Sequence, residues 1–361
     1  MGTHRIIYIR TDGNHKIASG HLMRCLSIAS ACKSLGMEVC FLVCEKESYS
    51  LLKELSSSDD CFQIIPLKTA VYDQPERELS EISTLLLSHH EKPIYLLDSY
   101  YVTSFYLSEL KPLAKLAYLD DLQLFDYPVE LLINYDVITE ETMPTYKAAY
   151  QSSHRLLLGT AYAPLRRQFQ NNPISVRKQV GNLLITTGGS DPCHFCLHFL
   201  YSLKENPSAW PFGPDGLKIH MVIGKLNTDR DAIYKLAETL PFLKPHENVS
   251  DMASLMQVCD LAISAAGTTL YELCALGIPT MSFALADNQV TAAKSFDTAG
   301  AIPCAGDIRK DPKGVMHSLT TFVTSMLSQE SYPARKSAHT AMRKLVDGNG
   351  ALRIAKALEE M

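Results

Sequence analysis

The sequence predicts an α/β protein built from two doubly wound, parallel-sheet (Rossmann-like) domains. Short apolar runs rich in β-branched residues alternate along the chain with longer segments of helical spacing. This alternation is typical of βαβ units, whose strands are buried on both faces of a parallel sheet. The runs fall into two sets, one in each half of the chain, so we expect one domain from each set.

The first half of the chain supplies the first set of strands. In the helix after the first strand, apolar residues recur at helical spacing from His21 to Cys32, and Gly36 ends the pattern. The predicted strands are Arg5–Ile9, Val39–Val43, Phe62–Ile65, Ile94–Leu97, Leu116–Leu119, Leu131–Ile133 and Leu156–Leu158. They predict a first domain over residues 1–158.

The second half repeats the alternation with fewer strands, namely Asn182–Thr186, Lys218–Ile223, Leu261–Ser264 and Thr280–Phe283. Residues 159–179 are rich in Pro, Asn, Arg and Lys and show little periodicity, so we expect a linker there and a second domain over 180–350. The final helix, within 351–361, is expected to pack back on the first domain. Ligands of such sheets bind beyond the carboxyl ends of the strands, so we expect the site in a cleft between the domains.

Composition and charge exclude several classes of protein. The 361 residues carry a formal charge of −5, with 46% hydrophobic and 20% charged residues, which excludes a largely disordered chain and argues against non-specific binding to nucleic acid or anionic membrane. No apolar run reaches the ~18 residues of a membrane span, and the N-terminus has no signal-peptide pattern, so we expect a cytoplasmic protein. We also expect a monomer. The cysteines that lie among apolar neighbours are expected to be reduced core residues; they are Cys25, Cys32, Cys40, Cys44, Cys259 and Cys274.

The first strand-to-helix junction carries the residues that favour catalysis. It places His21 in the first helical turn, where the helix dipole favours a neutral imidazole. A neutral imidazole can act as a general base toward water, whereas the alternative is that His21 only caps or packs the helix start. Asp12 is predicted to orient the ring or to contact substrate. Asp98 and Tyr100, at the end of a later strand, are predicted to line the same cleft.

Two turns in the second half are predicted anion sites. One strand runs into Gly267, Thr268 and Thr269, whose amides and hydroxyls open a helix, and Glu272 follows where its carboxylate can accept from sugar hydroxyls. Another strand runs into the turn Thr187-Gly188-Gly189-Ser190. Asp191 follows as helix cap, with Pro192 at the first helical position. Two such turns fit a diphosphate, although each alone would be an ordinary turn between a strand and a helix. Neither turn matches a P-loop or a dinucleotide-binding pattern.

Two other polar clusters are weaker candidates. Cys193, His194, Cys196 and His198 fall within a predicted helix, and no second Cys/His pair at zinc spacing follows, so no metal site is expected. Asp120 and Asp121 are adjacent and point apart on a strand, which makes them weak candidates for paired acid/base chemistry.

Several blocks of residues, spread from Arg5 to about Ala301, carry a family resemblance. They are Arg10-x-Asp12, Gly20-His21-x-x-Arg24-Cys25, Asp98-x-Tyr100, Gly159-x-x-Tyr162-x-x-Leu165-Arg166-x-x-Phe169, Thr187-Gly-Gly-Ser190-Asp191, Asn248-Val249, Met252-Ala253, Gly267, Tyr271-Glu272 and Asp287-Asn288-Gln289. Together they resemble the PseG family, the UDP-2,4-diacetamido-2,4,6-trideoxy-β-L-altropyranose hydrolases of pseudaminic acid biosynthesis. The second half is also similar to MurG-type glycosyltransferases, which share the Gly-Thr-x-x-x-Glu block; the Gly-His-x-x-Arg block distinguishes the hydrolases.

This resemblance implies a GT-B architecture, with UDP bound by the second domain and no cofactor. It implies that the Val249 backbone meets the uracil, Arg166 the base or phosphate, and Glu272 the ribose. UDP would lie among Gly188, Gly189, Ser190, Gly267, Thr268 and Thr269, and the sugar near Asp12, Gly20, Arg24, Asp98, Tyr100, Asn288 and Gln289. Where the family tends to have Ile-Gly-x-Gly-His, this chain has Ala18, which strains the loop if that position needs a positive φ.

We therefore expect a UDP-sugar hydrolase. His21 would take a proton from a water that attacks the anomeric carbon, and C–O cleavage with inversion would release UDP and the free 6-deoxy-L-altrose derivative without a metal. Three alternatives stay open. A MurG-like UDP-sugar glycosyltransferase would use an acceptor hydroxyl instead of water, a hydrolysing 2-epimerase would change the configuration at C2, and a non-catalytic nucleotide-sugar binding protein would not need His21.

Overall fold

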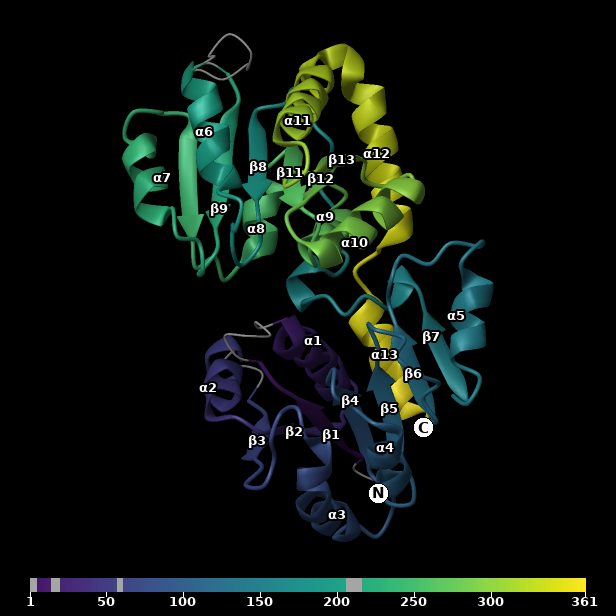
Figure 1. Cartoon of the computed structure of the whole chain (residues 1–361). Helices are drawn as coiled ribbons and strands as arrows, with labels where there is room; N and C mark the ends of the chain where they lie inside the picture. The colour runs from purple at the N-terminus through teal and green to yellow at the C-terminus, as the bar shows by residue number, and fades with distance from the viewer. Residues whose placement is uncertain (1–4, 14–19, 57–60, 206–215) are drawn as a thin grey trace. The chain divides into compact units, whose positions relative to one another are not determined.

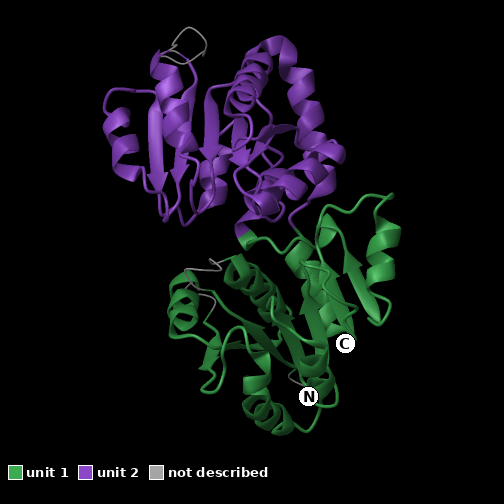
Figure 2. Cartoon of the chain, in the orientation of Figure 1, with its two compact units in different colours: residues 1–167, 349–361 green, residues 168–348 purple. Residues whose placement is uncertain are grey.

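The computed structural model describes residues 5–13, 20–56, 61–205 and 216–361. The chain forms two compact units, one of residues 1–167 and 349–361 and the other of residues 168–348 (Figure 2). In each unit, helices pack on a parallel β-sheet (Figure 1). This confirms the predicted fold class.

The first unit contains, among its described residues, a seven-stranded sheet in the order β3-β2-β1-β4-β5-β6-β7 with every neighbouring pair parallel. Its strands are β1 (Ile6–Thr11), β2 (Glu38–Val43), β3 (Gln63–Pro66), β4 (Ile94–Asp98), β5 (Lys115–Leu119), β6 (Leu131–Asn134) and β7 (Arg155–Leu158). Its helices are α1 (Gly20–Ser34), α2 (Lys46–Leu55), α3 (Leu79–Leu87), α4 (Ser104–Leu110), α5 (Met143–Ala149) and α13 (Gly350–Glu359), with short 3₁₀ turns η1 (Pro75–Glu78) and η2 (Thr160–Tyr162). Each run predicted in the first half overlaps one of these strands.

Helices cover both faces of this sheet because its strands are apolar on both faces. Ile7 and Ile9 of β1 face a core shared with α1 and α13, whereas Tyr8 between them faces a core shared with α3 and α4. The C-terminal helix α13 packs against α1 and contributes Ile354 and Leu358 to their common core. This packing fixes α1 against the face of the sheet that carries β1.

The second unit contains, within the described ranges, a six-stranded parallel sheet in the order β10-β9-β8-β11-β12-β13. Its strands are β8 (Asn182–Thr186), β9 (Lys218–Ile223), β10 (Leu243–Glu247), β11 (Leu261–Ala265), β12 (Thr280–Ala284) and β13 (Cys304–Asp307). Its helices are α6 (Phe195–Glu205), α7 (Arg230–Ala237), α8 (Met252–Gln257), α9 (Thr269–Leu276), α10 (Asp287–Thr298), α11 (Pro312–Leu327) and α12 (Tyr332–Leu345), with 3₁₀ turn η5 (Gln329–Ser331); η3 (Arg167–Phe169) lies where the two units divide. The edge strands β10 and β13 were not among the predicted runs.

The stretch 159–179 is not a free linker. Residues 159–167 belong to the first unit and residues 168–179 to the second. Gln168 accepts a hydrogen bond from the Ala253 amide at 2.8 Å, and the Ile174 amide donates to the Leu276 carbonyl at 2.8 Å. These bonds attach the stretch to the second unit well before the predicted start at residue 180.

Two further expectations concern the cysteines and membrane-spanning helices. Cys25, Cys32, Cys40, Cys259 and Cys274 are buried, whereas Cys44 is half-buried. In the part of the chain that the structure describes, no helix has the length and apolarity needed to cross a bilayer.

Candidate active site

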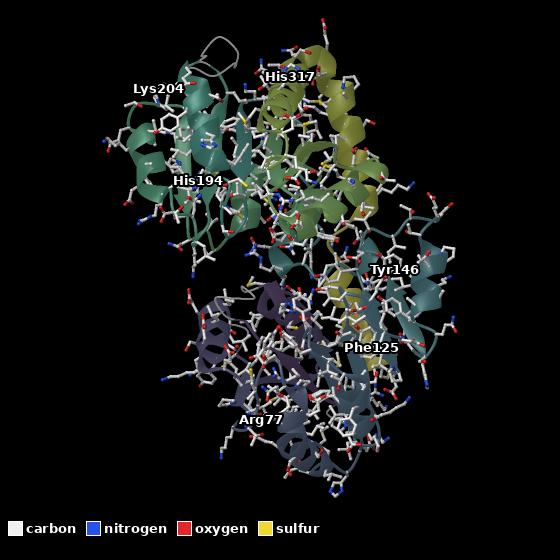
Figure 3. All side chains as sticks on the ribbon, in the orientation of Figure 1. Arg77, Phe125, Tyr146, His194, Lys204 and His317 are labelled. Atoms are coloured by element: carbon white, nitrogen blue, oxygen red, sulfur yellow. The ribbon has the colours of Figure 1, made fainter. Side chains whose placement is uncertain are left out.

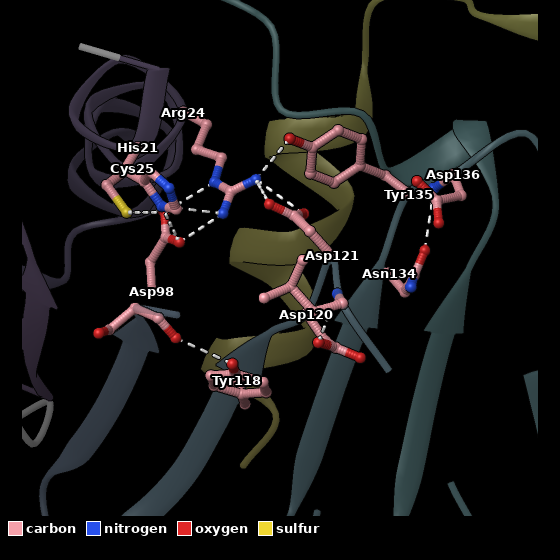
Figure 4. A network of polar contacts seen from close by, with 12 residues as sticks. His21, Arg24, Cys25, Asp98, Tyr118, Asp120, Asp121, Asn134, Tyr135 and Asp136 are labelled. Carbon is pink, nitrogen blue, oxygen red and sulfur yellow. Dashed lines mark hydrogen bonds and ion pairs between the residues drawn. The ribbon is translucent and has the colours of Figure 1, made fainter. Parts of the chain in front are cut away.

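A cluster of polar side chains gathers at the carboxyl edge of the first unit's sheet (Figure 4). Asp98 is the last residue of β4, Asp121 is the second residue after β5, and Tyr135 directly follows β6. His21 and Arg24 lie at the start of α1, which follows β1. Because β1, β4, β5 and β6 are parallel neighbours, their carboxyl ends meet at one edge. The structure thereby brings together the predicted residues His21, Arg24 and Asp98.

The His21 imidazole is held by Asp98. Its Nδ1 lies 2.5 Å from Asp98 Oδ1, and both side chains are buried. Burial works against the charge of Asp98, but the Arg24 guanidinium and His21 outweigh it and hold the pKa of this carboxyl well below its usual range. An ionised carboxylate only accepts hydrogen bonds, so this contact assigns a proton to Nδ1, and in a neutral ring the lone pair is then on Nε2. Arg24 Nη2 also lies 3.0 Å from Nδ1, but two donors do not bond to each other.

Arg24 organises the carboxylates of the cluster. Its Nε donates to Asp98 Oδ2 at 2.7 Å, and its Nη1 donates to both Asp121 oxygens at 2.9 and 2.8 Å and to the Tyr135 hydroxyl at 2.8 Å. Its Nη2 faces Asp98 Oδ1, and only 11% of the side chain is exposed. Among the described residues these contacts hold Arg24 against Asp98 and Asp121, and its contact with substrate stays a prediction.

Two neighbours of the pair complete the surroundings of His21. The Cys25 thiol donates to Asp98 Oδ2 at 3.2 Å, a contact that the sequence did not indicate. The ring of Tyr100 meets the His21 ring edge-on, with centroids 4.5 Å apart. Burial raises the pKa of Tyr100 to about 12, so its phenol stays protonated and can donate a hydrogen bond. Gly20, the first residue of α1, is exposed beside them.

Asp12 has a different partner from the one predicted. It is buried, its Oδ2 binds Arg10 Nη1, and its Oδ1 accepts a hydrogen bond from the Cys44 amide at 3.0 Å. Arg10 is in turn held by Glu78 at 2.9 Å. Asp98, not Asp12, orients the imidazole, because Asp12 is committed to joining the ends of β1 and β2. Ala18 lies outside the described residues.

The predicted residues of the second unit also gather at one sheet edge. Residues 188–190 follow β8, Val249 follows β10, and residues 267–269 follow β11 and open α9. Asn288 lies in the first turn of α10, directly after β12. These strands are parallel members of one sheet, so all these segments lie at its carboxyl edge.

The backbone geometry differs between the two turns that were predicted to bind a diphosphate. Gly188 has a φ of +82°, which favours glycine, and a Cβ added to Gly224 after β9 would overlap the backbone of Gly188 and Gly189. Gly224 was not singled out from the sequence. Thr268 stands at the N-cap of α9, but its side chain makes no capping hydrogen bond to the helix. Its exposed hydroxyl and the first amides of α9 form a suitable environment for an anion.

The remaining predicted ligand residues are Gln289, Arg166 and Glu272, and each has a different environment. Gln289 accepts a hydrogen bond from the Leu285 amide at 2.9 Å, which ties its side chain to the β12–α10 turn. Arg166 is half-buried and belongs to the first unit, unlike the other predicted UDP residues. Glu272 is half-buried in the first turn of α9, as the sequence predicted.

The Cys/His cluster does not form the helix face that was predicted. α6 begins at Phe195, so Cys193 and His194 precede it, and Asp191 accepts hydrogen bonds from the Phe195 and Cys196 amides at 2.9 and 2.8 Å. His194 is exposed and its Nδ1 lies 2.7 Å from Asp229 (Figure 3). Among the described residues, no group of three or more His, Cys, Asp or Glu side chains is arranged to hold a metal ion.

Comparison with known proteins supports the architecture. The model of the glycosyltransferase family 28 C-terminal domain matches residues 187–348, which lie within the second unit. The fold is similar to that of Acinetobacter baumannii MurG, with a TM-score of 0.67 and 16% identity over 99% of this chain and 100% of that one. The two-domain GT-B architecture implied by the sequence is therefore confirmed.

Curated relatives match the chain over part of their own length. The chain is 30% identical over 213 residues to the spore coat polysaccharide biosynthesis protein SpsG of Bacillus subtilis, covering 58% of this chain and 60% of that protein. It is 23% identical over 287 residues to the pseudaminic acid cytidylyltransferase and UDP-2,4-diacetamido-2,4,6-trideoxy-beta-L-altropyranose hydrolase of Helicobacter pylori, covering 78% of this chain and 44% of that protein. The chain thus spans about half the length of the curated relatives it matches.

Proposed function

We propose that this chain hydrolyses a UDP-linked sugar, specifically UDP-2,4-diacetamido-2,4,6-trideoxy-β-L-altropyranose. The observation that carries the proposal is the His21–Asp98 pair, in which a buried carboxylate holds the proton on Nδ1 and leaves Nε2 able to accept one. The name of the Helicobacter pylori relative includes hydrolysis of this UDP-sugar, and the Gly20-His21-x-x-Arg24 block supports the same assignment.

The chemistry is a single displacement at the anomeric carbon. His21 Nε2 takes a proton from water as the water oxygen forms its bond to that carbon. The bond from the carbon to the diphosphate oxygen breaks, and its electron pair leaves with UDP, so the configuration inverts. Asp98 stabilises the imidazolium that forms, because its carboxylate already accepts from Nδ1.

The second unit would bind the nucleotide. Backbone amides and hydroxyls around Gly188 and Thr268 would donate to the diphosphate and stabilise the charge that develops on it as it leaves. Glu272 would accept from the ribose hydroxyls. The first unit is less suited to phosphate, because the guanidinium of Arg24 is already shared by Asp98 and Asp121.

His21→Asn tests the proposal. The wild-type protein and the variant are incubated with this UDP-sugar, UDP release is measured, and the anomer of the free sugar is followed by NMR. A general base typically contributes about 10²–10⁴-fold to the rate, so we expect a loss of that size with KM little changed. His317→Asn, a change at an exposed position of α11, is the matched control and should retain full activity (Figure 3). Near-normal turnover by a folded His21→Asn protein would reject His21 as the base, and absence of turnover by the wild type would reject the reaction.

A glycosyltransferase reaction is the second candidate, and two observations favour it. The family 28 match covers the C-terminal unit, and exposed apolar side chains follow β4 and β5 near the His21 cluster: Tyr101, Phe105, Leu122 and Leu124. Such side chains would suit an apolar acceptor. UDP release that needs an added acceptor, with no free sugar formed in water, would support transfer over hydrolysis.

A further inference from the structure

Tyr72 lies beside the His21 cluster but has no part in the contacts described so far. It is in the loop between β3 and η1, and its ring packs edge-on against the ring of Tyr101, with centroids 5.1 Å apart. Tyr101 follows Tyr100, whose ring meets His21. Two consecutive tyrosines, Tyr101 and Tyr100, therefore lie between Tyr72 and the proposed base.

The Tyr72 hydroxyl is buried and makes no hydrogen bond in the described part of the chain. Other buried tyrosines of this unit have partners: the Tyr106 hydroxyl donates to Glu78 at 2.7 Å, that of Tyr150 to Asp120 at 2.6 Å, and that of Tyr118 to the Ser99 carbonyl at 2.9 Å. A buried hydroxyl without a partner costs free energy, so a group that satisfies it would bind favourably.

The surroundings of Tyr72 define what that group can be. Burial, followed by the carboxylates of Asp98 and Asp12, raises the pKa of Tyr72, so the phenol stays protonated and acts as a donor. The same carboxylates repel a phosphate oxygen, and the nearby guanidinium groups of Arg10 and Arg24 are already bound to carboxylates. The missing partner is thus an uncharged acceptor oxygen.

We propose that Tyr72 is a substrate-binding residue that donates a hydrogen bond to an uncharged oxygen of the sugar, with the carbonyl of an N-acyl substituent as its best match. A carbonyl oxygen only accepts, which suits a hydroxyl that remains a donor. This inference rests on the proposed function, because it requires the sugar to bind in the first unit. Tyr72 would set affinity and preference for N-acylated sugars, whereas His21 performs the proton transfer.

The test compares Tyr72→Phe with the parent in a His21→Asn background, where turnover does not disturb binding. Affinities for UDP and for the diacetamido UDP-sugar are measured by calorimetry. We expect Tyr72→Phe to weaken binding of the UDP-sugar about 5–30-fold and to leave UDP binding unchanged. With His21 intact, the same change should raise KM more than it lowers kcat.

Thermal stability separates this role from a structural one. Tyr72→Phe removes a hydroxyl that has no partner, so Tm should stay the same or rise. Tyr8→Phe is the matched control, because it removes a buried hydroxyl that is bonded to His89 at 2.8 Å; it should lower Tm and leave the affinity for the UDP-sugar unchanged.

The outcomes distinguish the two proposals. Equal binding of the UDP-sugar by Tyr72→Phe and its parent, with both tighter than for UDP, would overturn the role of Tyr72 and leave the proposed function intact. If the parent gains no affinity from the sugar, and the wild type does not turn it over, the proposed function itself fails. A drop in Tm for Tyr72→Phe with unchanged binding would show that the residue is structural only.

Discussion

Asp98→Asn perturbs the centre of the His21 cluster while conserving its shape. Asp98 accepts from His21 Nδ1 at 2.5 Å, from Arg24 Nε at 2.7 Å and from the Cys25 thiol at 3.2 Å. An asparagine amide can donate to Nδ1, which would move the ring proton to Nε2 and remove the lone pair proposed to receive the proton from water. It also leaves the buried guanidinium without one of its two carboxylates.

The expected losses follow from these contacts. Reversing the tautomer removes general-base catalysis, so kcat should fall about 10²–10⁴-fold. Removing one partner of a buried ion pair costs about 3–5 kcal/mol, and the lower end applies because Arg24 keeps Asp121 and Tyr135. The pKa of Asp98 is held below its unfolded value, so its stabilisation is present above about pH 4 and is lost as the pH falls. The stability gap between wild type and variant should therefore narrow on acidification.

Two measurements check this prediction. UDP release gives kcat and KM at neutral pH, and urea unfolding at pH 7 and below pH 4 gives the stability difference. Asp260→Asn is the matched control, because Asp260 is also buried and bound to an arginine, Arg177 at 2.7 Å, but precedes β11 at the opposite edge of its sheet. It should lose stability and keep kcat. Activity of Asp98→Asn within a few-fold of wild type, in a folded protein, would refute the role of the carboxylate in fixing the imidazole.

Two other substitutions test the surroundings of the candidate sites. Burial raises the pKa of Asp136 from 3.8 to about 6, so the cost of its charge to the folded protein grows between about pH 4 and pH 6 and is complete above pH 6. This rise corresponds to about 3 kcal/mol, so Asp136→Asn should add about that much stability at pH 7.5 and little at pH 4. Equal gains in urea unfolding at both pH values would contradict this. Gly224→Ala forces a Cβ into the backbone of Gly188 and Gly189, so UDP affinity should fall by more than about tenfold and stability by about 1–3 kcal/mol. Gly181→Ala, at the other end of β8, should do neither, because its Cβ would meet only Asp260 Oδ2, at an ordinary contact distance of 4.0 Å. Unchanged UDP binding by Gly224→Ala would show that the turn does not hold the nucleotide.

Alternation predicted the fold because central parallel strands are buried on both faces and must be apolar. Two strands of the second unit were not predicted, because they are not central strands and are not uniformly apolar. β10 (Leu243–Glu247) contains Lys244, Pro245 and His246, and β13 (Cys304–Asp307) contains Gly306; both are edge strands. An edge strand tolerates proline and polar residues, so these two lack the apolar run that the edge strands β3 and β7 keep.

The site was predicted where position in a βα unit determined it. His21 and Asp98 each stand at the end of a strand or the start of the following helix, and such positions converge in a parallel sheet. Asp121 and Tyr135 lie in the cluster because β5 and then β6 follow β4 in the sheet, an order that the sequence does not state. The pairing of Asp12 with Arg10 could not be predicted for a related reason, since it depends on the side-chain path of a buried arginine.

The contrast between the two sheet edges bears on the choice between hydrolysis and transfer. In the first unit, the Arg24 guanidinium is already bound to Asp98 and Asp121. This edge therefore offers carboxylates, phenols and the His21 imidazole to a ligand, and these groups suit neutral sugar oxygens and a proton transfer. Either reaction needs a base, and the two differ only in which hydroxyl reaches Nε2. His21 is 5% exposed, so a water can approach its ring more readily than an acceptor that must present a hydroxyl along with its own bulk. The limited access to the base therefore favours hydrolysis, and a transferase would have to open this edge before its acceptor could react.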